Sequence, residues 1–546
     1  MFHLKKIRIA KAASTEAFIK KASGRYYTGE LVGRRLAKTV ISAFAASNRF
    51  SQNVSVIDPF GGDGRLLVWL LEAWEQQCLP PCSWRLELWD LYDTDFNTAK
   101  ANLERLREHG FDIECSFKVG DAFQRGRTEF SKFDIVITNP PWELLKPDRR
   151  EIEVLEDLVR EEYISSMKSY DSWLADNFPI SQPSRKFAGW GTNLSRVGLE
   201  LSLRLSRSTG AVGIVLPASI MADDQSARIR EHLLTKHAIK DISYYPAEAK
   251  LFENADISSV TVVVETNGKP DKVLPISSFA VCAEQEKRID IEVDFERLSS
   301  VGFVLPVSFG ASGARLVSEL VSRFPLWRDL ESSQSSSFWA GREIDETGSS
   351  SWLHPLSNES LPFLKGRMIE RYRVKELPKL GVLKNGSFPA SVKYERIAWR
   401  DVSRPSQKRR VIATLVPPGW ILGNSLGVAF FSDGSEGATR ALLGIMNSTV
   451  FEFILRAYLA TGHVSLSALR KVPVPDVEQL KSEIRLQQLV SNAIDGSEDA
   501  DILVDAYVAR RVYKLVLSEY SMILDFFPKL DVEEKAKRYC AFEECN

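Results

Sequence analysis

Between about residue 30 and residue 270 the chain alternates short apolar runs with longer amphipathic segments. Short apolar runs are typical of buried strands, whereas apolar residues that recur every three or four positions indicate helices. The predicted strands are 54–57, 85–89, 116–119, 133–138, 211–216 and 259–264, and the predicted helices are 31–44, 66–74, 97–108 and 226–235. Strands that alternate with helices predict an α/β fold, with a mainly parallel, Rossmann-like sheet that has helices on both faces.

Polar side chains stand where four of the predicted strands end. Asp58, Asp90 and Asp121 follow the first three strands, and Asn139 follows the fourth. The carboxyl ends of parallel strands meet at one edge of a sheet, which is where open α/β sheets bind their ligands. A single carboxylate of this kind is explained by a solvated loop or a helix N-cap. Four polar strand ends in succession predict one ligand site to which all four contribute.

The strand ending at Thr138 leads directly into Asn139-Pro140-Pro141-Trp142. Two successive prolines have no N–H donors and hold the backbone extended, so the Pro140 carbonyl is not used in a helix or a sheet ladder. The motif therefore presents an amide, a carbonyl oxygen and a flat aromatic face together. These groups suit a planar ring with an exocyclic amino group, such as adenine, because two oxygens accept its N–H hydrogens while Trp142 stacks on the ring. The competing interpretation is a strand terminator followed by an incidental aromatic residue.

A glycine-rich turn, residues 58–64, follows the first predicted strand. The turn lacks the third glycine of the dinucleotide fingerprint GxGxxG, and the chain has no GxxxxGK[ST] phosphate loop. A carboxylate at the start of the turn would repel a phosphate, so Asp58 favours a cationic or zwitterionic ligand. Asp90 is placed to accept hydrogen bonds from a ribose diol, and Asp121 is placed to accept one from an adenine amino group.

Taken in order, these motifs resemble the adenine-N6 DNA methyltransferases of the gamma motif order, the TaqI-like modification enzymes of type II restriction-modification systems. Asp58-Pro59-x-x-Gly62-x-Gly64 resembles the DPxxGxG loop of that family. The stretch from Asp90 to Leu103 and the tripeptide Gly120-Asp121-Ala122 resemble its next two cofactor motifs, and Asn139–Trp142 resembles its catalytic NPP(Y/F/W). Upstream, residues 24–28 resemble the element G-x-(Y/F)-Y-T-P, although Gly29 stands where the family has proline.

The resemblance implies S-adenosylmethionine as cofactor and assigns roles to particular residues. The implied cofactor-binding residues are Tyr26, Tyr27, Thr28, Asp58, Pro59, Phe60, Gly62, Gly64, Asp90, Leu91, Asp121, Ala122 and Asn139. The implied catalytic residues are Asn139, Pro140, Pro141 and Trp142. Thr28 is also expected to cap the helix that follows it. Trp142 and Phe252 are expected to stack on the target base, although Phe252 is equally well explained as a core residue. Asn193-Leu194 resembles a further family element, NLY, with Ser195 in place of the tyrosine.

The net charge of the chain is −1, but its basic residues are unevenly distributed. Residues 365–410 contain fourteen Lys and Arg residues against four acidic ones, with aromatic residues interleaved. A basic segment in an otherwise acidic protein is typical of a phosphate-binding face, although a merely solvated charged surface has the same composition. The candidate DNA-contact residues are Lys365, Arg367, Arg371, Arg396, Arg400 and Arg404. Their split between base and phosphate contacts is not decided by the sequence.

A chain of 546 residues is too long for one ordinary core. The predicted domains are an N-terminal extension (1–23), a methyltransferase catalytic domain (24–270), an α+β DNA target-recognition domain (271–480) and a C-terminal helical segment (481–546). Short motifs in the third of these resemble the recognition domains of the TaqI-like enzymes. They are 363–367 with 371–372, 397–401, 423–426, 443–448 and 472–475. The last segment has helical periodicity over 480–494 and 500–524.

Composition narrows the setting in which the chain works. Six cysteines are scattered and lack histidine partners at ligand spacing, so we expect reduced thiols and no metal site. No apolar run approaches the length of a membrane span, and the N-terminus has no signal-peptide pattern. These features predict a cytoplasmic protein with no membrane association. Double-stranded DNA is the partner expected from the basic segment and the family resemblance, and a monomer is expected.

The predicted function is methylation of adenine N6 at specific DNA sites, in protection against a separate restriction endonuclease; the last step rests on family analogy. Three alternatives stay open. Relatives with an NPPY motif methylate RNA guanine N2 or protein glutamine, and the chain could be a catalytically dead DNA-binding relative. A combined nuclease–methyltransferase is not expected, because about 23 residues precede the Gly24 element and no PD…(D/E)xK arrangement stands out.

Overall fold

The protein is described by a computed structural model in which the chain forms two compact units, Met1–Arg315 (unit 1) and Leu316–Asn546 (unit 2). The structure describes residues 28–47, 52–146, 157–184, 191–249, 257–279, 286–332, 337–345, 352–384, 388–403, 407–459 and 463–545. Among these residues, no single helix has the length and apolar character of a membrane span, and one bent pair, Glu436–Met446 with Thr449–Arg456, meets that test only when the two are joined.

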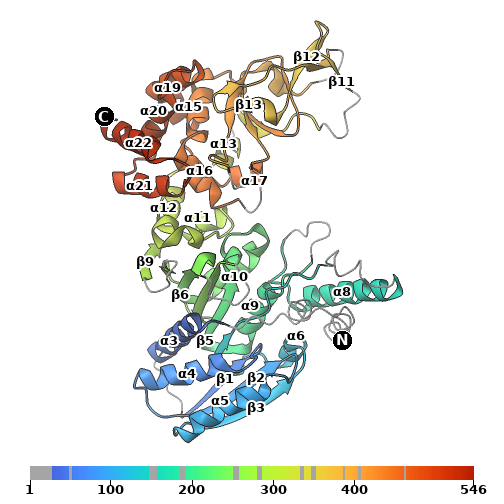
Figure 1. The fold of residues 1–546 in the computed structure, drawn as a ribbon, viewed down its shortest axis with the longest axis vertical. Coiled ribbons are helices and arrows are strands. Elements are labelled where there is room, and N and C mark those ends of the chain that lie inside the picture. The colour runs from blue at the N-terminus through green and yellow to red at the C-terminus, as the bar shows by residue number, and fades with distance from the viewer. Residues whose placement is uncertain are drawn as a thin grey trace. The chain divides into compact units, whose positions relative to one another are not determined.

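Unit 1 is built on a nine-stranded sheet with the strand order β3-β2-β1-β4-β5-β7-β6-β8-β9 (Figure 1). The strands are β1 (Asn53–Asp58), β2 (Ser83–Asp90), β3 (Asp112–Val119), β4 (Phe133–Thr138), β5 (Ser206–Pro217), β6 (Ala238–Tyr245), β7 (Ser259–Glu265), β8 (Val273–Phe279) and β9 (Glu286–Glu292). Strands β1 to β5 are parallel, whereas β7 is antiparallel to its neighbours β5 and β6. Up to β5 the order is that of a doubly wound nucleotide-binding sheet, and β7 is inserted before β6.

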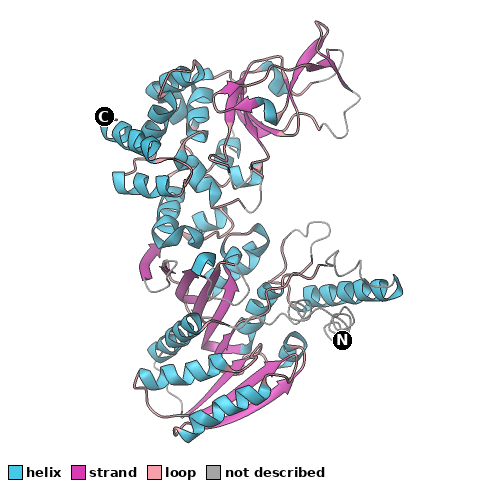
Figure 2. Cartoon of the chain, in the orientation of Figure 1, coloured by secondary structure: helices cyan, strands magenta, loops and turns pink. Residues whose placement is uncertain are grey.

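Helices cover both faces of this sheet (Figure 2). The helices of unit 1 are α3 (Glu30–Ala46), α4 (Arg65–Gln76), α5 (Phe96–Glu108), α6 (Ala122–Arg125), α8 (Asp157–Asn177), α9 (Leu194–Leu205), α10 (Ala227–Lys236), α11 (Phe295–Ser300) and α12 (Gly310–Arg323), which runs on into unit 2. Helices α3, α4 and α5 share one apolar core with the sheet, while α9 packs against β4 and β5 on the other face. The fold class predicted from the alternating pattern is therefore confirmed.

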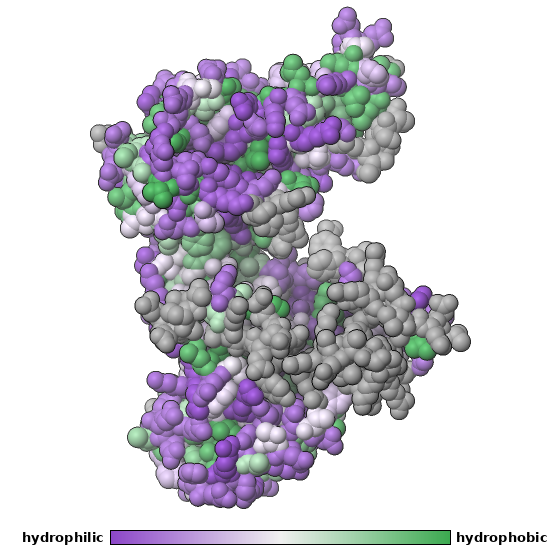
Figure 3. All heavy atoms as spheres, viewed as in Figure 1, coloured by the Kyte–Doolittle hydropathy of each residue, from purple (hydrophilic) through white to green (hydrophobic). Residues whose placement is uncertain are grey.

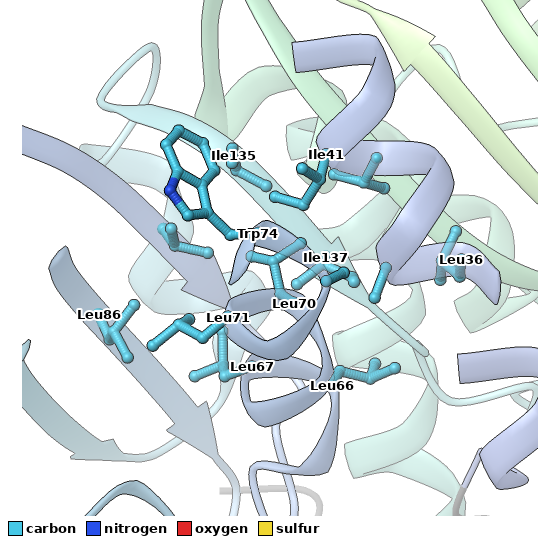
Figure 4. Close-up of a cluster of buried hydrophobic side chains, with 14 of the residues drawn as sticks. Leu36, Ile41, Leu66, Leu67, Leu70, Leu71, Trp74, Leu86, Ile135 and Ile137 are labelled. Carbon is cyan, nitrogen blue, oxygen red and sulfur yellow. The ribbon is translucent and has the colours of Figure 1, made fainter. Parts of the chain in front are cut away.

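The core under α3 and α4 holds the centre of the sheet in place (Figure 4). In this close-up Ile41 of α3 and Leu70 and Trp74 of α4 lie near Ile135 and Ile137 of β4, and Leu36 of α3 lies farther along the same core. All of these side chains are buried, and each contributes about 1.5–3 kcal/mol relative to an exposed position. Because β4 is anchored in this way, the residue that follows it is presented from a rigid strand.

The predicted elements match the structure closely, but several elements were missed. Strands β6, β8 and β9 and helices α8 and α9 were not predicted, and β8 and β9 lie beyond the sequence boundary at residue 270. They extend the same sheet, because β8 pairs in parallel with β6 and β9 pairs with β8. Unit 1 consequently continues to Arg315.

Unit 2 combines small sheets with a helical bundle. Its sheets have the orders β10-β19-β16-β17, β11-β15-β12-β18 and β13-β14. The strands are β10 (Phe338–Gly341), β11 (Leu353–Pro355), β12 (Ser360–Leu364), β13 (Ile369–Glu370), β14 (Arg373–Val374), β15 (Leu380–Leu383), β16 (Arg396–Arg400), β17 (Ala413–Val416), β18 (Ile421–Leu422) and β19 (Leu426–Phe431). The helices are α13 (Trp327–Ser332), α15 (Glu436–Met446), α16 (Thr449–Arg456), α17 (Leu466–Leu469), α18 (Val477–Ser482), α19 (Ile484–Ile494), α20 (Ala500–Tyr507), α21 (Leu517–Asp525) and α22 (Val532–Glu544). This composition agrees with the expected α+β character.

The C-terminal helices belong to the same compact unit as these sheets. The boundary expected at residue 480 stays a prediction. The helix predicted over 500–524 is interrupted, because a π-helical turn, Val508–Val512, ends α20 before α21 begins at Leu517. The described cysteines (78, 82, 115, 540 and 545) are all free thiols.

Candidate active site

The predicted ligand edge lies at the centre of the sheet, between β1 and β4. The strand order reverses here, since β2 and β3 lie on one side of β1 while β4 and β5 lie on the other. Such a switch point leaves a crevice at the carboxyl ends of the strands. Asp58 ends β1 and Asn139 follows β4, so these two residues flank the switch point directly. Asp90 ends β2, and Asp121 follows β3 by two residues.

Asp58 is a buried carboxylate, 1% exposed. It accepts hydrogen bonds from the Thr138 hydroxyl at 2.6 Å and from the Phe60 amide at 3.1 Å. Burial raises the pKa of Asp58 to about 7, although both of these hydrogen bonds act in the opposite direction. In the described part of the chain no basic side chain forms an ion pair with it. A buried carboxylate without a counter-ion is costly unless a ligand supplies the positive charge.

The glycine-rich turn is tied to Asp90. The Gly62 amide donates to one carboxylate oxygen at 3.1 Å, and the Tyr92 amide donates to the other at 2.9 Å. Gly62 and Gly64 have φ angles of 51° and 74°, in the left-handed region that favours glycine. The turn therefore has a fixed shape, with its backbone drawn toward the end of β2. The carboxylate keeps acceptor capacity, because each oxygen has two lone pairs.

Asp121 begins the short helix α6 as its N-cap. One carboxylate oxygen accepts from the Phe123 amide at 2.9 Å, and the other accepts from the Tyr170 hydroxyl at 2.8 Å. Burial raises the pKa of Tyr170 well above 10, and Asp121 adds to the effect. The tyrosine therefore remains a hydroxyl donor at neutral pH. Ala122, the next predicted residue, is buried, and Leu91 is half-buried after Asp90.

Asn139 is oriented by Thr28. Its amide nitrogen donates to the Thr28 hydroxyl at 3.2 Å, which leaves the side-chain oxygen of Asn139 as the acceptor end. The expectation that Thr28 caps the following helix is wrong. Gly29 occupies the N-cap position of α3, and no side chain makes a capping hydrogen bond there. Thr28 is itself held in place, because Arg65 donates to its carbonyl oxygen at 3.2 Å.

Pro140 is packed closely against α9. A Cβ added at Gly198 would lie 2.3 Å from the Cβ of Pro140, so only glycine allows this approach. Phe60, on the turn after β1, is the next neighbour of the same point at 3.6 Å. Pro59 is buried beside it, Pro141 is half-buried, and Trp142 is a partly buried residue that packs against the core under α3 and α4.

The basic residues of unit 2 divide into a buried and an exposed group. Arg396 is completely buried and ion-paired with Glu343 at 2.7 Å, and Arg371 is ion-paired with Asp501. Both guanidinium groups are thus paired with acids of unit 2. Arg396 is fully buried, which corrects the expectation that it contacts DNA, whereas a DNA contact by the half-buried Arg371 stays a prediction. Arg400 is also engaged, because its Nε donates to the Gly366 carbonyl at 2.7 Å.

Other members of the basic segment remain at the surface. Lys365 is half-buried, and its ammonium lies over the Phe363 ring. The exposed ones are Arg367, Arg373, Lys375, Lys379, Lys384, Lys393 and Lys408. Hydrophilic residues predominate on the face of unit 2 visible in Figure 3. Of the candidate DNA-contact residues, Arg367 is therefore the one that is exposed among those the structure describes.

Some predicted site residues lie outside the described residues, namely Tyr26, Tyr27, Phe252 and Arg404. Conversely, the structure adds residues that the sequence reasoning missed. Tyr170 of α8 and Gly198 of α9 contact Asp121 and Pro140 respectively. A glycine inside a helical stretch is a signal of close approach and could have indicated Gly198. In the described ranges, no cluster of His, Cys, Asp and Glu side chains is arranged to hold a metal ion.

A comparison with protein-family models finds one match over part of unit 1. Residues 65–252 match the family model described as Eco57I restriction-modification methylase, a range that includes Asp90, Asp121 and Asn139–Trp142. This stretch is therefore similar to the methylases of restriction-modification systems. No curated protein matches the chain.

Three solved structures resemble the chain at low identity. The methyltransferase subunit of a type I restriction-modification system from Streptococcus thermophilus is 19% identical over 53% of this chain and 56% of its own, with a TM-score of 0.33. The type IIG restriction endonuclease BpuSI is 12% identical over 96% of this chain and 66% of its own, with a TM-score of 0.44. The type IIL restriction-modification enzyme MmeI, solved in complex with DNA, is 12% identical over 94% of this chain and 76% of its own, with a TM-score of 0.43. The chain thus spans little more than half of the first structure and about two thirds of the second.

Proposed function

We propose that the chain is a site-specific DNA adenine-N6 methyltransferase that uses S-adenosylmethionine. The protein would modify one adenine in its recognition site and protect the DNA from a separate restriction endonuclease, as the modification enzyme of a type II system. The match of residues 65–252 to a restriction-modification methylase supports the general class. The choice of adenine N6 rests on the Asn-Pro-Pro-Trp motif and its surroundings.

The observation that carries the proposal is the division of the switch point into two sides. On one side Asp58, with its raised pKa and no basic partner among the described residues, fits the positively charged methionyl end of the cofactor. Asp90 and Asp121, on the next two strands, fit its ribose and its adenine amino group. On the other side, Asn139 is oriented by Thr28 with its oxygen as the acceptor end. One edge of the sheet thus holds groups for a cofactor and for a methyl acceptor.

The residues of the acceptor side would act on the nitrogen of the target base. Adenine N6 is a poor nucleophile because its lone pair is delocalised into the ring. Hydrogen bonds from both N6 hydrogens, to the Asn139 oxygen and the Pro140 carbonyl, would favour a pyramidal nitrogen and localise that lone pair. When bound, the cofactor supplies an electrophilic methyl group on its sulfonium sulfur. The protein's task is then mainly one of positioning, and the N6 proton can leave to water after transfer.

The acceptor is proposed to be a base extruded from duplex DNA. Extrusion costs a few kcal/mol, roughly, and aromatic stacking on the extruded base offsets it. Trp142 is the aromatic residue of the motif that would provide this stacking, with Phe252 as a second candidate. Arg367 and Lys393 are exposed cations of unit 2 that fit phosphate or base-edge contacts.

The test is transfer of labelled methyl groups from S-adenosylmethionine to duplex DNA, RNA or protein, followed by sequencing of modified adenines in the DNA. We expect N6-methyladenine in one sequence context, and labelling of RNA or protein alone would contradict the proposal. The variant Asn139→Ala should lower transfer by about 1,000-fold while cofactor affinity is kept, because an interaction made with the reacting nitrogen is removed. Asn53→Ala, at the opposite end of β1, is the control. Turnover by Asn139→Ala near that of the control would exclude the mechanism.

A further inference from the structure

Helix α8 joins two parts of the candidate site through two consecutive residues. This helix lies in the sequence between the Asn-Pro-Pro-Trp motif and α9. The Tyr170 hydroxyl donates to a carboxylate oxygen of Asp121 at 2.8 Å. The next residue, Asp171, accepts a hydrogen bond from the Thr192 amide at 2.6 Å. Because consecutive residues of a helix point in different directions, one turn of α8 contacts both partners at once.

The contact with Asp121 is rigid. Tyr170 is 7% exposed and its ring is stacked in parallel on Trp173, with centroids 5.9 Å apart. Trp173 in turn contacts Phe178, which packs on Phe123, the residue whose amide holds the other oxygen of Asp121. Both carboxylate oxygens are therefore fixed, and the acceptor positions that remain on them have a defined direction.

The contact made by Asp171 leads to the acceptor side of the site. The Thr192 carbonyl accepts from the Leu145 amide at 2.9 Å, and the Leu194 amide donates to the Glu143 carbonyl at 2.8 Å. Residues 143–145 and 192–194 thus form a short antiparallel ladder, which we call the post-catalytic ladder. Its first strand begins directly after Trp142, and its second strand leads into α9, where Gly198 supports Pro140.

We propose that Tyr170 and Asp171 are positioning residues that couple cofactor binding at Asp121 to acceptor binding beside Trp142. The inference rests on the proposed function, since it takes Asp121 as the partner of the cofactor's adenine amino group and DNA as the acceptor. A cofactor that binds Asp121 stabilises the hydrogen bond to Tyr170 and thereby the position of α8. Asp171 then holds the post-catalytic ladder in the arrangement that receives the base. Coupling of this kind is reciprocal, so DNA must raise cofactor affinity by the same factor.

The Tyr170 contact is tested by Tyr170→Phe, which keeps the ring stacked on Trp173 and removes only the hydroxyl. Affinities for S-adenosylhomocysteine and for S-inosylhomocysteine, which lacks the amino group, are measured by calorimetry on the full chain. We expect the variant to bind the adenosyl compound about 5- to 10-fold more weakly, because a hydrogen bond to a charged group is lost. The wild-type protein should prefer S-adenosylhomocysteine to S-inosylhomocysteine, and this preference should be smaller in Tyr170→Phe. An unchanged preference would overturn the role of Tyr170.

The Asp171 contact is tested by Asp171→Ala, with Asp176→Ala, an exposed position on the same helix, as the matched control. The duplex carries the site identified by sequencing modified adenines, and S-adenosylhomocysteine prevents turnover. We expect the wild-type protein and the control to bind this duplex about 10-fold more tightly with S-adenosylhomocysteine than without it, as is typical of coupled sites. In Asp171→Ala this factor should approach one while the affinity for either ligand alone is kept. If Asp171→Ala fails to fold, Asp171→Asn, which retains an acceptor oxygen without the charge, is expected to show a reduced factor.

The outcomes separate this inference from the proposed function. Wild-type protein that methylates DNA but shows no coupling, or Asp171→Ala that keeps the full factor, would overturn the inference alone. Absence of DNA methylation would remove the proposed function and the acceptor half of the inference with it. The measurement on Tyr170→Phe needs no DNA, so the link between Tyr170 and Asp121 would still be decided.

Discussion

The switch point of unit 1 and the interior of unit 2 both contain buried ionisable groups. Among the described residues, those in unit 2 are paired with opposite charges, whereas Asp58 at the switch point is not. In unit 2, Glu452 is ion-paired with Arg409 and Arg456, and it also accepts from the Arg410 and Val411 amides. In the described part of unit 1, the partners of Asp58 are a hydroxyl and an amide, and the nearby carboxylates Asp90 and Asp63 add repulsion. A charge that is fully compensated contributes to structure, whereas one left without a counter-ion marks a place for a ligand.

The largest loss of stability is expected where a buried charge is fully paired, at Glu452. Replacing Glu452 by Ala leaves the buried guanidinium of Arg409 without its counter-ion, so unit 2 should lose about 3–5 kcal/mol of stability. Chemical denaturation of the full chain measures the loss. Glu436→Ala, which breaks an exposed pair with Arg440, is the control and should cost about 1 kcal/mol at most. Equal losses in the two variants would mean that the buried network of unit 2 has no structural role.

Removing the charge of Asp58 is expected to stabilise the protein, in contrast to the loss expected at Glu452. The pKa of Asp58 is raised to about 7 from 3.8, so the folded protein prefers the protonated form. The stabilising effect of that proton is complete below about pH 4 and is lost as the pH rises to about 7. With 1.36 kcal/mol for each pKa unit, Asp58→Asn should stabilise the ligand-free protein at pH 8 by at most about 4 kcal/mol. At pH 4 the variant and the wild-type protein should have similar stability.

The same variant should lose cofactor affinity, because a neutral amide cannot compensate a cationic group. Wild-type affinity for S-adenosylmethionine should increase as the pH rises through about 7, where Asp58 ionises, and the affinity of Asp58→Asn should be weak and independent of pH. Calorimetry across this pH range is the measurement. A variant that is less stable at pH 8 and binds cofactor as well as the wild-type protein would assign Asp58 to the structural class of Glu452.

The difference between the two regions also explains what the sequence predicted well. Asp58, Asp90, Asp121 and Asn139 were located correctly because each follows a strand, and strand order determines where strand ends lie. The basic segment has no comparable pattern that indicates which of its side chains are buried and which are exposed. Arg396, Arg409 and Arg371 are bound by acids that are 53, 43 and 130 residues away in the chain, so their local sequence cannot indicate burial.

Helix α8 was missed for a different reason. Its buried residues Tyr163, Met167, Tyr170 and Leu174 have helical spacing. Charged and polar residues separate them, and no apolar run typical of a strand adjoins them in the sequence. The hydrogen bond from Tyr170 to Asp121 depends on packing between segments that are 49 residues apart. Hydrophobic periodicity indicates which face of a single helix or strand is buried. It does not indicate which residues of two distant segments come into contact.

The close contact between Gly198 and Pro140 should matter for the geometry of the candidate site in unit 1. Gly198→Ala would place a Cβ against Pro140 and shift the carbonyl proposed to bind the target nitrogen. A displacement of this size should lower kcat by about 100-fold, while overpacking costs stability by about 1–3 kcal/mol. Ser202→Ala, one helical turn later on α9, is the control because its hydroxyl donates within the helix, to the Gly198 carbonyl. If Gly198→Ala turned over as fast as this control, the position of Pro140 would not matter for catalysis.

The smallest effects are expected from the cations of unit 2 that remain exposed once the compensated arginines are set aside. Arg367→Gln and Lys393→Gln should leave the melting temperature unchanged, because neither side chain is buried. Each should reduce the slope of log affinity for DNA against log salt by about 0.9 if it contacts a phosphate. A residue that reads a base would instead relax the sequence preference at one position. Lys514→Gln, an exposed cation outside the basic segment, should change neither quantity. If all three variants behaved alike, the DNA face would lie elsewhere, and the basic segment would serve unit 2 only through its buried ion pairs.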